Sequence, residues 1–244
     1  ESVRVSANRS RRMPCRSSSV YGAGAGLRRS CAATSWWQHG AARTSDARQP
    51  TARAKASSVA VSHACKASTT SGGGSSTSLY TEPNEKGQRG DVNYFQVDEQ
   101  GVETFGVELV EGRDLDAAVV KKPERNSSTS PPEILLTRDA ARELFPKGSA
   151  LGKTVYTGTN DPITIVGIID HMHGSWPGWD KVGNVALFPV ISDESYARYI
   201  VRAKPGQRDA MMKLAEEALN KVDNGRVILR TRTQEYIAAS TYAD

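Results

Sequence analysis

The segment from Glu133 to Asp170 constrains the fold most, because its signals for strand, helix and turn follow one another in a fixed order. Ile134–Leu136 is an apolar run of the kind that favours a strand. Thr137 can accept a hydrogen bond from a free N–H group at a helix start, so a helix is expected from about Arg138. Pro146 has no backbone N–H and should stop it. A turn and two more strands follow, which predicts a mixed fold.

The last third of the chain predicts a strand, a helix and a second strand. Tyr196–Ala203 alternates in polarity as a strand does, and Arg226–Thr233 does so again. Between them a helix is expected from about Gln207 to Val222, because its apolar residues repeat at the spacing of one helix face. The members of this stripe are Met211, Leu214, Ala215, Ala218, Leu219 and Val222.

The composition of the chain changes near Glu82. Residues 1–82 hold 12 of the 32 Lys and Arg but 3 of the 27 Asp and Glu, so their net charge is +9 and that of the remainder is −4. This first part has no Ile and no Phe. Apolar burial at about 25 cal/mol per Å² then cannot offset the roughly 1–2 kcal/mol per residue that ordering a backbone costs. We expect a low-complexity basic segment that is disordered or frame-shifted.

Three interpretations of residues 1–82 stay open. A basic arm could bind nucleic-acid phosphates, but its arginines are scattered and the remainder of the chain is acidic, so no nucleic-acid partner is expected. A targeting peptide would need an amphipathic helix, which the scattered Gly and Pro oppose. A shifted reading frame in a GC-rich gene also yields this composition, and we favour it. The cysteines, Cys15, Cys31 and Cys65, lack the spacing of zinc ligands.

A phosphate-binding loop is suggested by G-S-A-L-G-K-T at Gly148–Thr154, because such loops end in G-K-T. The motif needs four residues between its glycines, and three are present here. It must also open a helix whose N–H groups face the phosphate, whereas this loop follows a helix and enters a strand. We therefore expect no nucleotide and no cofactor.

The segment that follows the expected strand Ile165–Asp170 holds the candidate contact residues of the chain: His171, His173, Trp176 and Trp179. Two histidines at i and i+2 on a strand would share a face, but a third ligand is not identifiable, so no metal is expected. The two tryptophans flank Pro-Gly and either cover a core edge or present a contact patch; both interpretations stay open. No catalytic residues are expected, because no nucleophile–base set has suitable spacing.

Several of these stretches together resemble one family. They are V-N-Y-F-Q-V at Val92–Val97, G-R-D-L at Gly112–Leu115, the capped helix through G-K at Thr137–Lys153, I-V-G-I-I-D at Ile165–Asp170, and A-L-F-P-V at Ala186–Val190. Their order and spacing resemble the MacB-like periplasmic core domain of ABC-transporter permeases, in the FtsX-like permease superfamily. The resemblance runs from about Val92 to Thr233. The family often has Asn where this chain has Thr137, and both residues can cap a helix.

The resemblance implies an α+β fold of two small mixed lobes. The domain would span residues 83–244, with a β-rich lobe at 92–190 and a porter-like strand–helix–strand lobe at 194–233, after the low-complexity segment 1–82. Relatives carry foldable sequence where residues 1–82 stand, which is a further reason to suspect a shifted frame.

The resemblance also implies a function in transport. The domain would lie on the periplasmic face of the bacterial inner membrane and pass ATP-driven movement to cargo or an adaptor. Its partners would be a cytoplasmic ABC ATPase, on a separate subunit or domain, a periplasmic adaptor or cargo, and a second copy in a dimeric transporter. No apolar run nears the 18 or so residues that cross a bilayer, so the chain would be an excised or truncated part. The alternatives are a free-standing secreted binding module and, least favoured, a nucleotide-using enzyme.

Overall fold

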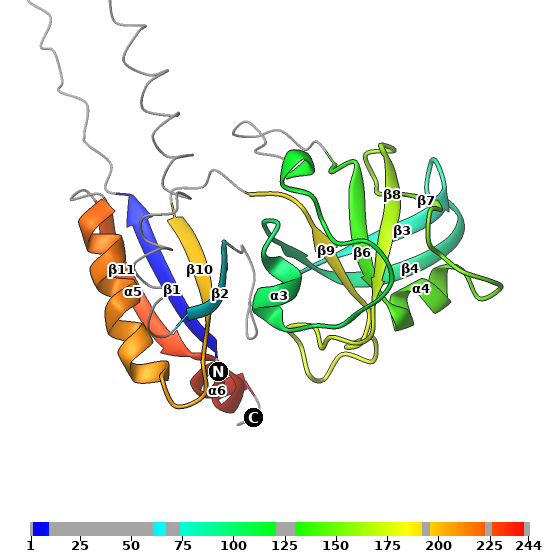
Figure 1. Ribbon diagram of the computed structural model, residues 1–244. Coiled ribbons are helices and arrows are strands. Elements are labelled where there is room, and N and C mark those ends of the chain that lie inside the picture. The colour runs from blue at the N-terminus through cyan, green and yellow to red at the C-terminus, as the bar shows by residue number, and fades with distance from the viewer. Residues whose placement is uncertain are drawn as a thin grey trace, which may run out of the picture.

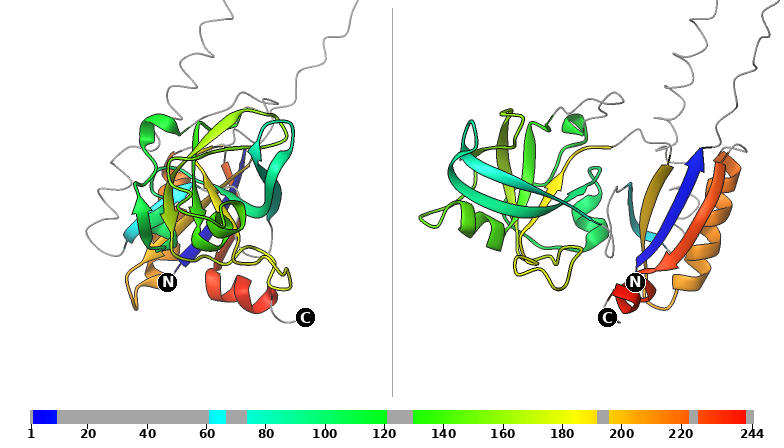
Figure 2. Two further views of the ribbon diagram at one scale, coloured as in Figure 1. Left: turned by 90° about the vertical axis from the view of Figure 1, so that its right-hand side faces the viewer. Right: turned by 180° about the vertical axis from the view of Figure 1, so that it is seen from behind.

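The computed structural model describes residues 2–9, 61–66, 74–120, 130–191, 196–222 and 226–241. These residues form two lobes that lie side by side, a porter-like lobe and a β-rich lobe (Figures 1 and 2). Each lobe contains both strands and helices, so the predicted α+β fold with two mixed lobes is confirmed. None of the described helices is long and apolar enough to cross a membrane.

The porter-like lobe is a four-stranded antiparallel sheet in the order β11-β1-β10-β2. Helix α5 covers the face of the sheet that is turned away from the β-rich lobe (Figure 1). The predicted strand, helix and return strand are all present. The elements are β1 (Ser2–Arg9), β2 (Val61–Lys66), β10 (Tyr196–Ala203), α5 (Arg208–Val222), β11 (Arg226–Thr233) and α6 (Gln234–Thr241).

Three strands precede residue 83, which corrects the expectation that the folded elements begin there. β1 lies inside the porter-like sheet between β11 and β10, β2 lies at its edge, and β3 (Ser75–Glu82) belongs to the β-rich lobe. The sequence S-V-R-V-S-A-N-R of β1 alternates as a strand should, but an average over 82 residues hides so short a signal. Residues 10–60 and 67–73 lie outside the described part, so a shifted frame there stays a prediction.

Helix α5 packs on the porter-like sheet through the predicted stripe. Met211 is fully buried against Val201 and Ala203 of β10. Val201 and Ala203 stand two residues apart on β10 and therefore face the same side of the sheet. Ile200 and Arg202 alternate with them and face the β-rich lobe. Further residues that pack on this core are Met212, Leu214, Ala215, Leu219 and Ile228.

The β-rich lobe is a sheet in the order β5-β8-β6-β9-β4-β3-β7, and a further pairing of β8 with β7 closes it into a barrel. The pairs β4–β9 and β6–β8 are parallel and the remaining pairs are antiparallel. Its elements besides β3 are β4 (Lys86–Gln96), α3 (Gly101–Phe105), β5 (Leu109–Gly112), the 3₁₀ turn η1 (Ala117–Val119), β6 (Glu133–Thr137), α4 (Arg138–Leu144), β7 (Thr154–Tyr156), β8 (Pro162–Ile169) and β9 (Val185–Phe188).

Helix α4 begins as the sequence predicts. The Thr137 side chain accepts a hydrogen bond from Ala140 N at 3.4 Å. Ala140 and Leu144 are buried against the barrel, while Phe145 lies just beyond the helix and is half-buried. The helix therefore ends two residues before Pro146.

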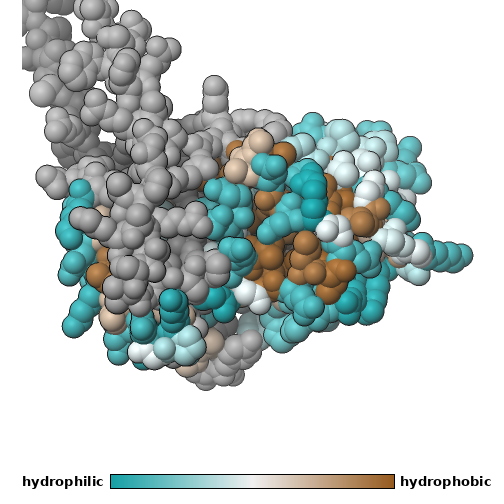
Figure 3. All heavy atoms as spheres, in the orientation of Figure 1, coloured by the Kyte–Doolittle hydropathy of each residue, from teal (hydrophilic) through white to brown (hydrophobic). Residues whose placement is uncertain are grey.

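Buried apolar residues form two clusters in the barrel. The first lies under α4 and the second lies toward α3 and the porter-like lobe. Figure 3 shows hydrophobic residues on the face of this lobe that is turned to the viewer, between hydrophilic margins. The half-buried residues that pack against the second cluster are Phe105, Val107, Leu109, Val166 and Met172.

Candidate partner-contact site

The predicted contact residues all lie in one connection between β8 and β9, residues 170–184, which we call the tryptophan loop. The Trp176 side chain is exposed, and Trp179 is half-buried. Their rings pack edge to face, with centroids 5.9 Å apart and planes at 82°. Such a T-shaped pair is a favourable aromatic arrangement. The two tryptophans therefore support each other at the surface, and neither belongs to the three buried apolar clusters.

The backbone of the tryptophan loop is folded on itself. Gly174 N donates to Val182 O at 2.7 Å, which ties the two arms of the loop together. Trp179 N donates to Trp176 O, and Val182 N to Trp179 O, both at 3.1 Å. These bonds fix the turn that carries the tryptophan pair, because backbone groups with partners resist rearrangement.

The fully buried Asn93 of β4 anchors the first arm of the loop. Its Oδ1 accepts a hydrogen bond from Ser175 N at 3.0 Å, and its Nδ2 donates to Ser75 O at 2.9 Å. A side chain on Gly174 would press on Asn93 at 3.0 Å. Ser175, the residue before Trp176, is thus bonded to β4 of the barrel.

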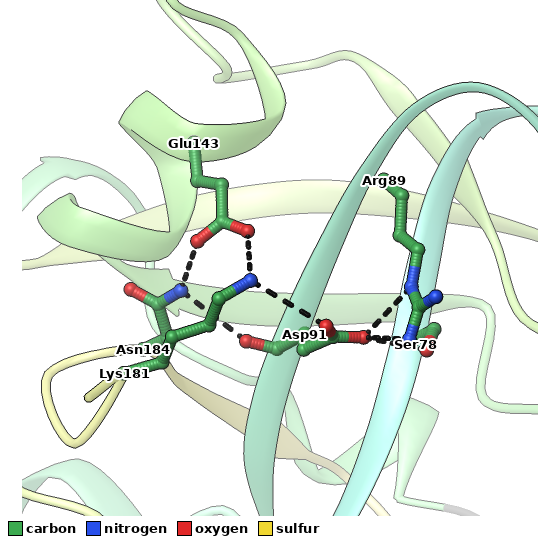
Figure 4. A network of polar contacts seen from close by, with 6 residues as sticks. All are labelled: Ser78, Arg89, Asp91, Glu143, Lys181 and Asn184. Carbon is green, nitrogen blue, oxygen red and sulfur yellow. Dashed lines mark hydrogen bonds and ion pairs between the residues drawn. The ribbon is translucent and has the colours of Figure 1, made fainter. Parts of the chain in front are cut away.

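The second arm of the loop, which contains Lys181 and Asn184, is bonded to the barrel by a network of polar side chains (Figure 4). Lys181 Nζ lies 2.6 Å from Glu143 Oε1 of α4 and 3.4 Å from Asp91 Oδ2 of β4. Asn184 Nδ2 donates to Glu143 and, at 3.2 Å, to Asp91 O. The second arm of the loop is therefore bonded to both α4 and β4.

Neighbouring side chains shift the pKa values of Asp91 and Lys181 in this network. Burial tends to raise the pKa of the Asp91 carboxyl, but hydrogen bonds from Ser78 and Arg89 bring that pKa below its ordinary value. The hydrogen bond to Glu143 raises the pKa of Lys181. Both groups are therefore charged at neutral pH.

The two histidines do not share a strand face, because β8 ends at Ile169 and both follow it in the loop. Both are exposed. His171 Nδ1 lies 3.0 Å from Asp170 Oδ2, and Asp170 Oδ1 lies 2.7 Å from Arg138 of α4. The hydrogen bond with His171 lowers the pKa of the Asp170 carboxyl, and Arg138 adds to that effect. Among the described residues, no three potential metal ligands come together.

The G-R-D-L stretch has a structural explanation. Gly112 has a φ of 76°, and a Cβ there would meet the backbone of Val166 and Gly167. Arg113 then binds the buried Glu133 through two hydrogen bonds, at 3.0 and 2.5 Å. This bidentate pair joins the end of β5 to the start of β6.

The G-K-T stretch closes a turn. Gly152 N donates to Ile165 O at 2.8 Å, and Lys153 Nζ lies 4.5 Å from the centre of the Phe145 ring. The loop joins α4 to β7, as the sequence indicates, so its N–H groups do not begin a helix.

Sequence reasoning missed one further site, the junction between the lobes. Arg202 of β10 donates from Nε to Thr104 O at 2.8 Å and from Nη2 to Phe105 O, the last carbonyl of α3. Ile200, also of β10, is buried in the second cluster of the barrel. An arginine at a helix C-terminus satisfies free carbonyls and complements the helix dipole. We call these contacts the lobe junction.

The side chains at the tryptophan loop and the lobe junction bind elements of the fold to one another. The chain belongs to the MacB-like periplasmic core domain family, whose model matches residues 20–219. It is thus the periplasmic domain of a MacB/FtsX-like ABC-transporter permease.

Two solved structures are similar at low sequence identity. The extracellular domain of the noncanonic ABC-type transporter YknZ from Gram-positive bacteria is 12% identical over 75% of this chain and 88% of that chain, with a TM-score of 0.46. The periplasmic region of MacB from Actinobacillus actinomycetemcomitans is 14% identical over 97% of this chain and 91% of that one, also with a TM-score of 0.46. No curated protein matches the chain. The family assignment rests on the family model.

Proposed function

We propose that this domain is a non-catalytic coupling element that moves as one body when a separate cytoplasmic ATPase closes. It carries that movement across the membrane to cargo or a periplasmic adaptor, and it works in a dimeric transporter at the periplasmic face of the inner membrane. The tryptophan loop, with His171, His173, Trp176 and Trp179, is its contact element.

The observation that carries this proposal is the lobe junction. A coupling element must not bend between the part that receives movement and the part that delivers it. Arg202 binds two carbonyl oxygens of the other lobe, and Ile200 is buried in that lobe's core. Charged hydrogen bonds and apolar burial at one contact oppose separation of the lobes.

The firm attachment of the tryptophan loop supports the same function. Asn93, Lys181 and Asn184 bind both of its arms to the barrel. A contact element that is fixed in this way moves with the barrel and would transmit displacement to whatever it touches.

Hydrogen exchange in the permease assembled with its ATPase tests the proposal. Trapping ATP should change amide exchange in the tryptophan loop of the wild type. In Arg202→Met the change should stay within the porter-like lobe, while the matched variant Arg230→Met, at an exposed position of β11, should behave as the wild type. A wild-type loop that does not respond to ATP, or a loop in Arg202→Met that responds fully, would show that movement does not pass through this junction.

A further inference from the structure

Strand β11 is an open edge of the porter-like sheet. Among the described strands it pairs with β1 alone, and it is the strand of this sheet that lies farthest from the β-rich lobe (Figures 1 and 2). Its sequence, R-V-I-L-R-T-R-T, contains no proline and no lysine. Proteins commonly protect an edge strand with such residues, because its outer N–H and C=O groups can bond to another strand. β11 is therefore open to an added strand.

Exposed apolar residues gather along β11 and the helix that follows it. Val227 and Leu229 of β11 are each 53% exposed, and Tyr236 of α6 is 56% exposed. The other exposed large apolar side chains of the described residues, Leu151 and Trp176, lie in the β-rich lobe. A single exposed apolar residue is ordinary, but several on adjoining elements indicate a contact surface.

Two arginines give the same strand a positive charge. Arg232 is in register, across β1, with Ile200 of β10, which faces away from α5. Arg230 stands two residues earlier and shares that face of the sheet. The guanidinium of Arg232 lies 5.1 Å from the centre of the Tyr236 ring, a contact that orients it. β11 holds no acidic residue, so the strand combines apolar and basic side chains.

We propose that β11 binds an extended acidic segment of a partner protein, which adds a strand to the porter-like sheet. In this mode of recognition the backbone hydrogen bonds supply affinity, and side chains at alternate positions supply specificity. Acidic side chains of the segment would lie beside Arg230 and Arg232, and apolar ones beside Val227 and Leu229.

A second copy of β11 fits this edge less well than an acidic segment does. Two β11 strands that paired with each other would bring the arginines of both copies into one short stretch of sheet, and like charges on neighbouring strands are destabilising. Because β11 has no acid, no register of that pair forms a salt bridge. Charge complementarity therefore favours an acidic partner. β11 and the tryptophan loop belong to different lobes, so this contact leaves the loop open to cargo or an adaptor.

The experiment measures binding of fluorescent peptides to the full chain by anisotropy, at concentrations up to about 1 mM. The peptide T-E-V-E-V-E-T carries its acids on one face of a strand, and T-K-V-K-V-K-T carries lysines there instead. The acidic peptide should bind at least about tenfold more tightly, because charged hydrogen bonds to arginine are strong. It should also slow hydrogen exchange at the amides of β11. The exchange of β10, which has a strand on each side, should not change.

Leu229→Glu puts a negative charge beside the acidic peptide and should weaken its binding by about tenfold. Leu151→Glu is the matched control, because Leu151 is also exposed but lies in the β-rich lobe. This control should bind the peptide as the wild type does. Both variants should melt close to the wild-type temperature, since substitutions at exposed positions change stability little. Val227→Glu should weaken binding as Leu229→Glu does, so the test does not depend on the folding of one variant.

Equal affinity for the two peptides, no binding of the acidic peptide, or equal affinities of Leu229→Glu and Leu151→Glu for it would overturn the proposal. Binding that leaves the β11 amides unprotected would also overturn it, because the peptide would then be attracted without adding a strand. None of these outcomes bears on coupling between the lobes. Arg230 is outside the lobe junction, and the hydrogen-exchange experiment with ATP contains no acidic segment, so Arg230→Met remains its control.

Discussion

Arg202 lies against Gly106, so a residue of the porter-like sheet occupies the space where a side chain would stand at the end of α3. A Cβ built on Gly106 would meet the Arg202 guanidinium. Gly106 also has a φ of 67° and caps α3 in the left-handed conformation. The absence of a side chain thus serves both the end of the helix and the approach of the other lobe.

Gly106→Ala should destabilise the chain by about 2–4 kcal/mol, because the left-handed conformation costs alanine about 1–2 kcal/mol and the new Cβ displaces Arg202. Gly148→Ala isolates the first effect, since Gly148 has a φ of 88° with no atom within 4 Å. Urea unfolding measures both. Equal losses in the two variants would mean that the guanidinium contact contributes nothing.

Arg202→Met should destabilise the chain by about 1.5–3 kcal/mol, because the carbonyl groups of Thr104 and Phe105 lose a charged donor. Arg230→Met should change the free energy of unfolding by less than about 0.5 kcal/mol, since Arg230 is exposed. Thermal unfolding of both variants measures the difference. Equal melting temperatures of Arg202→Met and Arg230→Met would show that the bonds of Arg202 to Thr104 and Phe105 do not stabilise the fold.

Arg113→Met should cost about 1–3 kcal/mol, because it leaves the carboxylate of Glu133, whose side chain is 9% exposed, without its bidentate partner. The double variant Arg113→Met with Glu133→Gln should recover part of the loss. Arg142→Met is the matched control, since Arg142 is 70% exposed and its pair with Asp139 is long, at 3.7 Å. No recovery in the double variant would contradict a charge-based explanation.

The attachment of the tryptophan loop should depend on pH at both extremes. The folded-state pKa of Asp91 is below its ordinary value of 3.8, so its contribution to stability is present above that pH and is lost as the pH falls through the lowered pKa. The pKa of Lys181 is above 10.5, so its contribution is present below that pH and is lost as the pH rises through the raised pKa.

Emission from Trp176 and Trp179, in the background without Trp36 and Trp37, measures this dependence between pH 2 and pH 11, a range on the order of that over which Asp and Lys titrate. It should be constant near neutrality and change at both ends. Asp91→Asn should reduce the change in emission at low pH. Asp139→Asn, which removes an exposed carboxyl, should leave that change as it is in the wild type. An acid change that is identical in Asp91→Asn would contradict the role of this network.

Local signals predicted the elements that depend on neighbouring residues. Thr137 caps α4, and the stripe through Met211 covers the porter-like sheet, because capping and amphipathic spacing act within a few residues. The predicted position of β10 at Tyr196–Ala203 is also confirmed.

Contacts between distant segments left no such signal. Arg202 is one of the polar residues that alternate with apolar residues along β10. The carbonyl groups that accept its hydrogen bonds lie 97 and 98 residues earlier, so the sequence alone does not pair Arg202 with them. The glycine in F-G-V could have indicated a helix end at Gly106, but not what occupies its space. β1 escaped detection because its strand partners, β10 and β11, lie in the last fifth of the chain.

The distance between the two lobes shows whether they move as one body. In a chain with Cys15, Cys31 and Cys65 changed to Ser, spin labels at Lys213→Cys on α5 and Arg142→Cys on α4 report that distance from two exposed positions. In the permease assembled with its ATPase, the distance between the two labels of one protomer should give a narrow peak at the same position with and without trapped ATP. A shifted or divided peak on trapping ATP would contradict movement of the two lobes as one body.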